Sequence, residues 1–181
     1  MPQQLDGSTR PGAAGASLTA GLAPKRASES ATEMVQVVLP NDANPLGFIL
    51  GGTVMHLIDI AGAIACHRHT RSLLVTAAVD GLQFLHPIKV GDLIILKSRV
   101  TAAWTTSLEA EVEVFSEETL TGVRRMTSVA YLTFVGIDRD NRRIPVPPLI
   151  LETPEEKRKA AEADVRRAAR LKARKELEAR G

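Results

Sequence analysis

Hydrophobic and polar residues alternate along much of the second half of the chain. The clearest stretch is residues 107–115, in which Leu108, Ala110, Val112 and Val114 alternate with three glutamates. A period of two is typical of a strand with one face in the core and one face in water. Apolar runs bounded by turn residues predict further strands over residues 34–39, 74–84, 93–102 and 123–137.

One segment is hydrophobic without alternation. Residues 53–66 (TVMHLIDIAGAIAC) place apolar residues on almost every side of a helix, which predicts a helix that is buried on most sides. The order of strand, buried helix and four further strands favours an α+β fold, in which an antiparallel sheet of five to six strands wraps around one central helix. One such sheet is too small to enclose the helix, so we expect at least a dimer.

The two ends of the chain differ from this central part. Residues 1–30 consist mainly of Gly, Ala, Ser, Thr and Pro, and we expect them to be a disordered tail. Residues 31–150 would form the folded domain. In the C-terminal extension, 151–181, the segment Thr153–Glu156 (TPEE) reads as a capping box that starts a charged helix. Because its charges are mixed in sign, we expect this helix to lie on its own domain rather than to bind a polyanion.

Composition excludes several classes of protein. The 181 residues are 44% hydrophobic, which is enough for one packed core. Only 3% are aromatic and the net charge is +2, so a nucleic-acid partner is not expected. The single cysteine, Cys66, excludes an intrachain disulfide and a multi-cysteine metal site. No apolar run approaches the ~20 residues that span a bilayer, and no secretory signal is visible, so we expect a cytoplasmic protein without membrane insertion.

Two ionisable residues lie within the apolar helix. An unpaired carboxylate in such a place is costly, so Asp59 is either a buried polar anchor or a catalytic group. His56 lies three residues earlier, on the same face of the helix, and an acid–base pair with Asp59 is conceivable. A core histidine with satisfied hydrogen bonds is the preferred interpretation of His56.

The residues just before this helix are candidates for binding a carbonyl oxygen. Gly51 and Gly52 stand where the helix begins, and the first amide groups of a helix have no internal partner. Glycine lets a ligand approach them closely, as in an oxyanion hole, although a simple tight turn would explain the same pair. Asn44, in the turn of residues 41–47, could orient a water molecule or could only shape an Asx turn.

An ordered series of motifs runs through residues 35–175. It consists of NDAN (41–44), GGTVM (51–55), DIAGA (59–63), RH (68–69), VTAAVD (75–80), FLHPI (84–88), GD (91–92) and VPPL (146–149). Taken in this order, the motifs resemble the hot-dog-fold acyl-CoA thioesterases, specifically the brain-type cytosolic acyl-CoA hydrolases and their single-domain bacterial relatives.

The resemblance implies hydrolysis of an acyl-CoA thioester to a free carboxylic acid and coenzyme A. It implies that Asn44 and Asp59 are the catalytic pair, that they meet across a dimer, and that the assembly is a hexamer built as a trimer of dimers. Asp59 would act as general base to water or as nucleophile, Asn44 would position the water or the carbonyl, and the Gly52 amide would stabilise the oxyanion. No cofactor or metal is expected, because coenzyme A is part of the substrate.

Coenzyme A also needs groups that bind its phosphates and pantetheine. The candidates for substrate binding are Gly51, Gly52, Thr76, Ser107 and Arg124. Two other functions remain open at this point. A hot-dog hydratase or dehydratase could use His56 and Asp59 as base and acid, and a non-catalytic acyl-CoA-binding protein could use the basic C-terminal helix to bind a partner.

Overall fold

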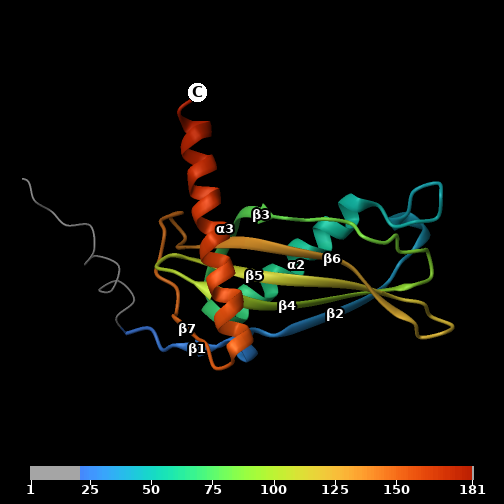
Figure 1. The fold of residues 1–181 in the computed structure, drawn as a ribbon, viewed down its shortest axis with the longest axis horizontal. Coiled ribbons are helices and arrows are strands. Elements are labelled where there is room, and N and C mark those ends of the chain that lie inside the picture. The colour runs from blue at the N-terminus through green and yellow to red at the C-terminus, as the bar shows by residue number, and fades with distance from the viewer. Residues whose placement is uncertain (1–20, 181) are drawn as a thin grey trace, which may run out of the picture.

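A five-stranded antiparallel sheet forms the centre of the structure, a computed structural model that describes residues 21–180. The strand order is β2-β4-β5-β6-β3, so that β2 and β3 are the two edges of the sheet (Figure 1). The bounds are β2 (Thr32–Val37), β3 (Leu73–Asp80), β4 (Leu93–Ala103), β5 (Ser107–Glu117) and β6 (Arg124–Ile137). The predicted antiparallel sheet around one helix is confirmed.

The long apolar helix, α2 (Gly51–Thr70), packs on one face of the sheet. Its residues Leu57, Ile58 and Ala61 are buried with the alternating apolar side chains of β5 in one core. Gly62 lets the helix approach β6, because a Cβ atom there would lie 3.2 Å from the Phe134 ring. The helix extends beyond the predicted residues 53–66 at both ends and terminates at Arg71, which has a left-handed φ of 54°.

A second long helix, α3 (Pro154–Glu178), lies on the opposite face of the sheet. The predicted capping box starts it. The Thr153 hydroxyl accepts a hydrogen bond from the Glu156 amide at 3.1 Å, and the Glu156 carboxylate accepts one from the Thr153 amide at 3.1 Å. The helix crosses the strands and its C-terminal part reaches past β3 (Figure 1). It therefore lies on its own domain, as expected.

The face of β5 that was expected to be in water is covered by α3, so that expectation is wrong. Glu109 is 0% exposed and Glu111 is 3% exposed. Arg166 binds Glu109 with an Nη2–Oε1 distance of 2.7 Å, and the Lys159 ammonium lies 2.5 Å from Glu111. The predicted alternation is present in β5. Its glutamates, however, form ion pairs with basic side chains of α3 instead of facing solvent, and these ion pairs compensate for their burial.

Part of the expected disordered tail is structured. β1 (Lys25–Arg26) pairs with β7 (Leu149–Ile150), and a 3-10 turn, η1, spans Ala27–Ser30. The Ser30 hydroxyl is buried and accepts a hydrogen bond from the Val100 amide at 2.9 Å. The expectation is thus wrong for residues 25–30, because backbone and hydroxyl groups anchor them without much apolar area. Residues 21–24 form no helix or strand, and residues 1–20 of the predicted tail lie outside the described residues.

Within residues 21–180, no helix combines the length and hydrophobicity needed to cross a membrane.

Candidate active site

Asp59 lies on α2 and is half-buried, with one carboxylate oxygen held by the neighbouring edge strand. Thr76, on β3, donates its hydroxyl to Asp59 Oδ1 at 2.7 Å. This single hydrogen bond ties the helix to the edge of the sheet. It also leaves the second carboxylate oxygen of Asp59 without a hydrogen-bond partner among the described residues, so that a water molecule could bind there.

A β-bulge in β3 sets the orientation of Thr76. Thr76 pairs with Phe134 and Ala78 pairs with Thr133, so Ala77 is an extra residue between them. Phe134 belongs to the core beneath α2, and Thr76 therefore faces the same side of the sheet as Asp59. Bulges commonly re-aim side chains beside functional sites.

Asn44 lies in the loop that leads into α2, after the 3-10 turn η2 (Pro40–Asp42). Its side-chain oxygen accepts hydrogen bonds from the amides of Leu46 at 3.0 Å and Phe48 at 3.3 Å. The Asx-turn interpretation is thus confirmed for the oxygen. The side-chain nitrogen has no acceptor among the described residues and is available to donate to a ligand.

The first amides of α2 precede its hydrogen-bond ladder. The amide of Val54 bonds to the Leu50 carbonyl at 3.1 Å, so those of residues 51–53 come before the first internal hydrogen bond. Gly52 is exposed, and a Cβ atom at this position would meet no atom of the described part of the chain within 4 Å. A ligand oxygen can therefore reach the Gly52 amide directly.

A cavity of about 330 Å³ adjoins these residues. Asn44 and Gly51 line it, together with the apolar Phe48, Ile49, Val54 and the segment 84–88. Asp59 is not part of this lining. Within one chain, the structure thus brings Asn44 to the N-terminus of α2 and brings Thr76 to Asp59, but it does not place the two predicted catalytic residues in one cavity.

The two other predicted substrate-binding residues lie apart from this cavity. Ser107 lines a separate cavity between the sheet and α3. Arg124, at the start of β6, binds Glu117 with Nη2–Oε2 at 2.7 Å and Nε–Oε2 at 3.0 Å. In the single chain the Arg124 guanidinium is thus already paired with a carboxylate.

Two histidines of α2, His56 and His69, differ in their exposure to solvent. His56 is exposed, so the interpretation as a core histidine is wrong: the helix keeps one face that this chain does not cover. His69, in the last turn of α2, is completely buried and donates Nε2–H to the Pro147 carbonyl at 2.9 Å. Burial lowers the pKa of His69. Burial also raises the pKa of the Cys66 thiol, which packs in the core as a small apolar residue.

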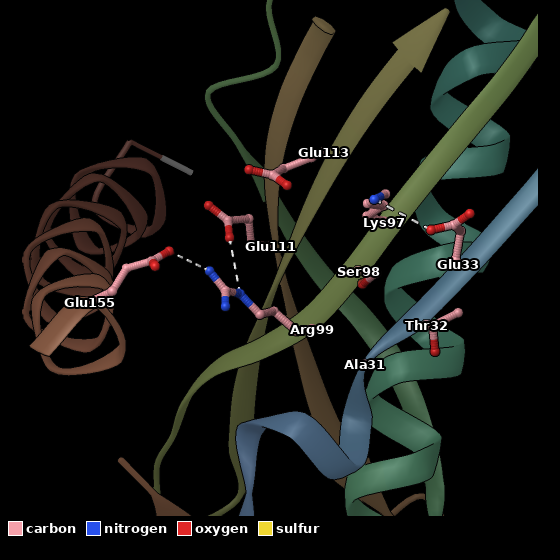
Figure 2. Close-up of a pocket in the computed structure, with 9 residues that line it drawn as sticks. All are labelled: Ala31, Thr32, Glu33, Lys97, Ser98, Arg99, Glu111, Glu113 and Glu155. Atoms are coloured by element: carbon pink, nitrogen blue, oxygen red, sulfur yellow. Dashed lines mark hydrogen bonds and ion pairs between the residues drawn. The ribbon is translucent and has the colours of Figure 1, made fainter. Parts of the chain in front are cut away.

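A cavity of about 460 Å³ on the α3 side of the sheet contains none of the predicted site residues. Figure 2 shows that its charges face one another. Arg99 contacts Glu155 at 2.7 Å and Glu111 at 3.6 Å, and Lys97 contacts Glu33 at 3.4 Å. The Arg99 pair holds α3 to the sheet, and the Lys97 pair joins the neighbouring strands β4 and β2. We therefore assign the cavity a structural role, despite its size.

No group of three or more His, Cys, Asp or Glu side chains in residues 21–180 has the arrangement of a metal site.

Comparison with known proteins places this geometry in a family. The model of the thioesterase superfamily matches residues 46–123, which include Asp59 and Thr76. An uncharacterized acyl-CoA thioester hydrolase of Bacillus subtilis is 38% identical over 128 residues, 71% of this chain and 74% of that protein. The human cytosolic acyl coenzyme A thioester hydrolase is 32% identical over 141 residues; the match covers 77% of this chain but 37% of the human protein.

Solved structures show the same fold. An acyl-CoA hydrolase of Bacillus cereus superposes with a TM-score of 0.81 and 33% identity, covering 86% of this chain and 94% of that one. An acyl-CoA hydrolase of Staphylococcus aureus, solved in complex with butyryl coenzyme A, coenzyme A and coenzyme A disulfide, gives a TM-score of 0.76 and 32% identity, covering 85% and 96%. The chain has the hot-dog fold and belongs to the thioesterase superfamily, among the acyl-CoA thioester hydrolases.

Proposed function

We propose that this protein hydrolyses acyl-CoA thioesters to a free carboxylic acid and coenzyme A, with Asp59 as the catalytic carboxylate. The observation that carries the proposal is the hydrogen bond from Thr76 to Asp59 on the uncovered side of α2. A half-buried carboxylate with one oxygen fixed and one free is suited to bind and deprotonate water.

The Staphylococcus aureus relative supports the choice of residues. Variants of that hydrolase have been solved in which an asparagine, an aspartate or a threonine is replaced by alanine. The three altered positions have the same order and the same spacing along their chain as Asn44, Asp59 and Thr76 have along this one.

The proposed reaction needs water as its only co-substrate and no cofactor or metal. As general base, Asp59 takes a proton from the water molecule that attacks the carbonyl carbon. As nucleophile, Asp59 attacks the carbonyl carbon itself and forms a transient anhydride, which water then hydrolyses to the free acid. On either route the Gly52 amide donates a hydrogen bond to the oxyanion that forms. The nitrogen of Asn44 orients the carbonyl or the water. Collapse of the tetrahedral intermediate breaks the carbon–sulfur bond and releases the coenzyme A thiolate, a good leaving group that needs little general-acid assistance.

The separation of Asn44 from Asp59 supports a site shared by two copies of the chain. β3 is an eight-residue edge strand that exposes Val75 (45%) and Val79 (53%), and the adjacent face of α2 exposes Met55 (50%). An uncovered apolar edge of this kind is a site for pairing with another chain. We propose that a second copy packs on it, so that Asp59 of one protomer meets Asn44 and Gly52 of the other.

Three such dimers would give the predicted hexamer. A solved hexameric acyl-CoA thioesterase is 37% identical to this chain, covers 84% of it and superposes with a TM-score of 0.80. Together with a cytoplasmic location, the hexamer stays a prediction for this protein, and light scattering of the purified chain tests the assembly.

The activity is tested by free-thiol release from a panel of acyl-CoA esters of increasing chain length. Thiol release with an equal yield of carboxylic acid is the expected result. Formation or loss of a carbon–carbon double bond without thiol release would instead identify a hydratase or dehydratase. Tight acyl-CoA binding with neither product would identify a binding protein.

A further inference from the structure

A third cavity, of about 380 Å³ and lined in part by Ser107, lies between the C-terminal half of α3 and the outer face of the sheet at its β3 edge. Its lining is basic and rich in hydroxyl groups, and the polar residues include Arg143, Arg167, Arg170, Arg174, Ser107 and Thr133. No Asp or Glu is among the described residues that line it. Positive charge that converges on a cavity without carboxylates is the electrostatic pattern of an anion site.

Two of the four arginines have no carboxylate partner in the part of the chain that the structure describes. Arg170 binds Asp80 and Arg174 binds Glu178, but no ion pair neutralises Arg143 or Arg167 there. Arg167 is nevertheless held in place, because its guanidinium lies 4.9 Å from the centre of the Trp104 ring. The Trp104 indole in turn donates to Asp164 at 2.8 Å. Arg167 is thus positioned without losing its charge.

Thr133 supplies an independent observation. The residue is 5% exposed, it lines this cavity, and its hydroxyl has no hydrogen-bond partner within residues 21–180. A buried hydroxyl without a hydrogen-bond partner costs about 1–3 kcal/mol of stability. Because this hydroxyl lies beneath an arginine cluster, it points to a ligand as its hydrogen-bond partner.

The β3 bulge makes room for such a ligand. Ala77 and Ala78 are consecutive in sequence, yet both line the cavity, because the extra residue of the bulge interrupts the normal alternation. Their small side chains form part of its wall, and Leu171, Leu177 and Val135 add apolar surface beside the arginines. Positive charge next to apolar surface suits a phosphorylated nucleoside.

We propose that this cavity binds the phosphate groups of a nucleotide, with Arg143 and Arg167 as the principal charges and the Thr133 hydroxyl as a hydrogen-bonding group. These phosphate groups would belong either to a free adenine nucleotide or to the phosphorylated adenosine end of acyl-CoA. The acyl-CoA alternative rests on the proposed function. Thr76 precedes Ala77 directly on β3, so the cavity and the Asp59 side are separated by the edge strand alone.

The test measures binding of ADP and of coenzyme A by titration calorimetry to the wild-type protein and to the double variant Arg143→Gln/Arg167→Gln. The matched control is Lys172→Gln/Lys175→Gln, which removes the same charge from exposed positions of α3 outside the cavity. We expect the first variant to weaken binding at least tenfold and the control to change it less than threefold.

Steady-state kinetics separate the two sources. If the phosphates belong to the substrate, the double variant raises KM for acyl-CoA and weakens coenzyme A binding while kcat is unchanged. If the ligand is a free nucleotide, ADP binding is lost and KM is unchanged. The ADP titration can be read even if the protein hydrolyses no acyl-CoA, which keeps this proposal distinct from the proposed function.

Thr133→Val provides a second readout. As a ligand-binding group, the hydroxyl is expected to contribute several-fold to ADP or coenzyme A affinity, and its loss should raise the melting temperature of the unliganded protein. Unchanged affinities for both ligands in Thr133→Val and in the double arginine variant would overturn the proposal. So would a double variant that altered only self-association, since the arginines would then serve contacts between copies.

Discussion

The Thr76 hydroxyl donates a hydrogen bond to the Asp59 carboxylate at 2.7 Å, across the boundary between α2 and the edge strand β3. The two residues are 17 positions apart in sequence, and a bulge at Ala77 adjusts the strand locally at the point of contact. The consequence is a carboxylate whose position is fixed by a neutral donor rather than by an ion pair, so that its charge remains available for chemistry.

Removing the Thr76 hydroxyl is expected to slow hydrolysis without unfolding the protein. A hydrogen bond to a charged group contributes roughly 1.5–3 kcal/mol, so Thr76→Val should lower kcat by about tenfold to a hundredfold. Thr76→Ser keeps the donor and should retain most of the activity. Equal losses in the Val and Ser variants, measured by thiol release, would contradict a role for the hydroxyl.

The side-chain oxygen of Asn44 holds the loop, whereas its side-chain nitrogen is available to a ligand. Two substitutions distinguish these two roles. Asn44→Asp keeps an oxygen for the amides of Leu46 and Phe48 but removes the donor, so the melting temperature should change little while kcat falls. Asn44→Ala removes both groups and should also cost stability, about 1 kcal/mol. Full activity in Asn44→Asp would restrict this residue to shaping the loop.

Gly52→Ala tests the proposed oxyanion site. The added methyl group meets no atom of residues 21–180 within 4 Å, and alanine is favoured over glycine in a helix by roughly 1 kcal/mol, so the protein should become no less stable. The same methyl group crowds the exposed amide, and we expect kcat to fall. An active and stabilised variant would show that the reaction does not use this amide. Melting curves and thiol release, recorded on the same preparation, give both values.

Tyr131, the only tyrosine of the chain, reports on the packing of α3. Burial first, and the adjacent Glu111 second, raise the pKa of Tyr131 from 10.0 to about 12. Between these values the unfolded state has released the phenol proton and the folded state retains it, so stability should fall as the pH rises from about 10 to about 12.

Ultraviolet titration of the phenolate band measures this directly, with the unfolded protein as reference. Tyr131→Phe should remove this contribution to the loss of stability at high pH. A midpoint near 10 in the folded protein would mean that α3 does not cover the phenol in solution.

The elements of the fold could be predicted because each depends on a local pattern. The alternation in residues 107–115 and the capping box at Thr153 both specify an element without knowledge of its neighbours. Whether a face is covered depends on residues distant in sequence, and here prediction failed. Nothing near Glu109 indicates that Arg166 will cover it, and nothing near His69 indicates that Pro147 will fold over it.

The candidate site was likewise predictable only where it depends on local sequence. Asp59 stands out as an acid in an apolar helix, and the glycines before it mark the start of that helix. The partner of Asp59 could not be predicted, because it depends on a one-residue bulge in β3 that turns Thr76 toward the helix. The apolar pattern of α2 also concealed its open face, since a surface that a second copy would cover has the same composition as the core.

The account rests on Asp59, and the rate of thiol release by the purified Asp59→Asn protein tests it most directly. The substitution preserves the shape of the side chain and an oxygen that can accept from Thr76, so the melting temperature should stay close to that of the wild type. Hydrolysis of acyl-CoA should fall by a factor of at least about a hundred, the scale of losing a general base. A folded Asp59→Asn protein that released thiol at a near-normal rate would contradict the account.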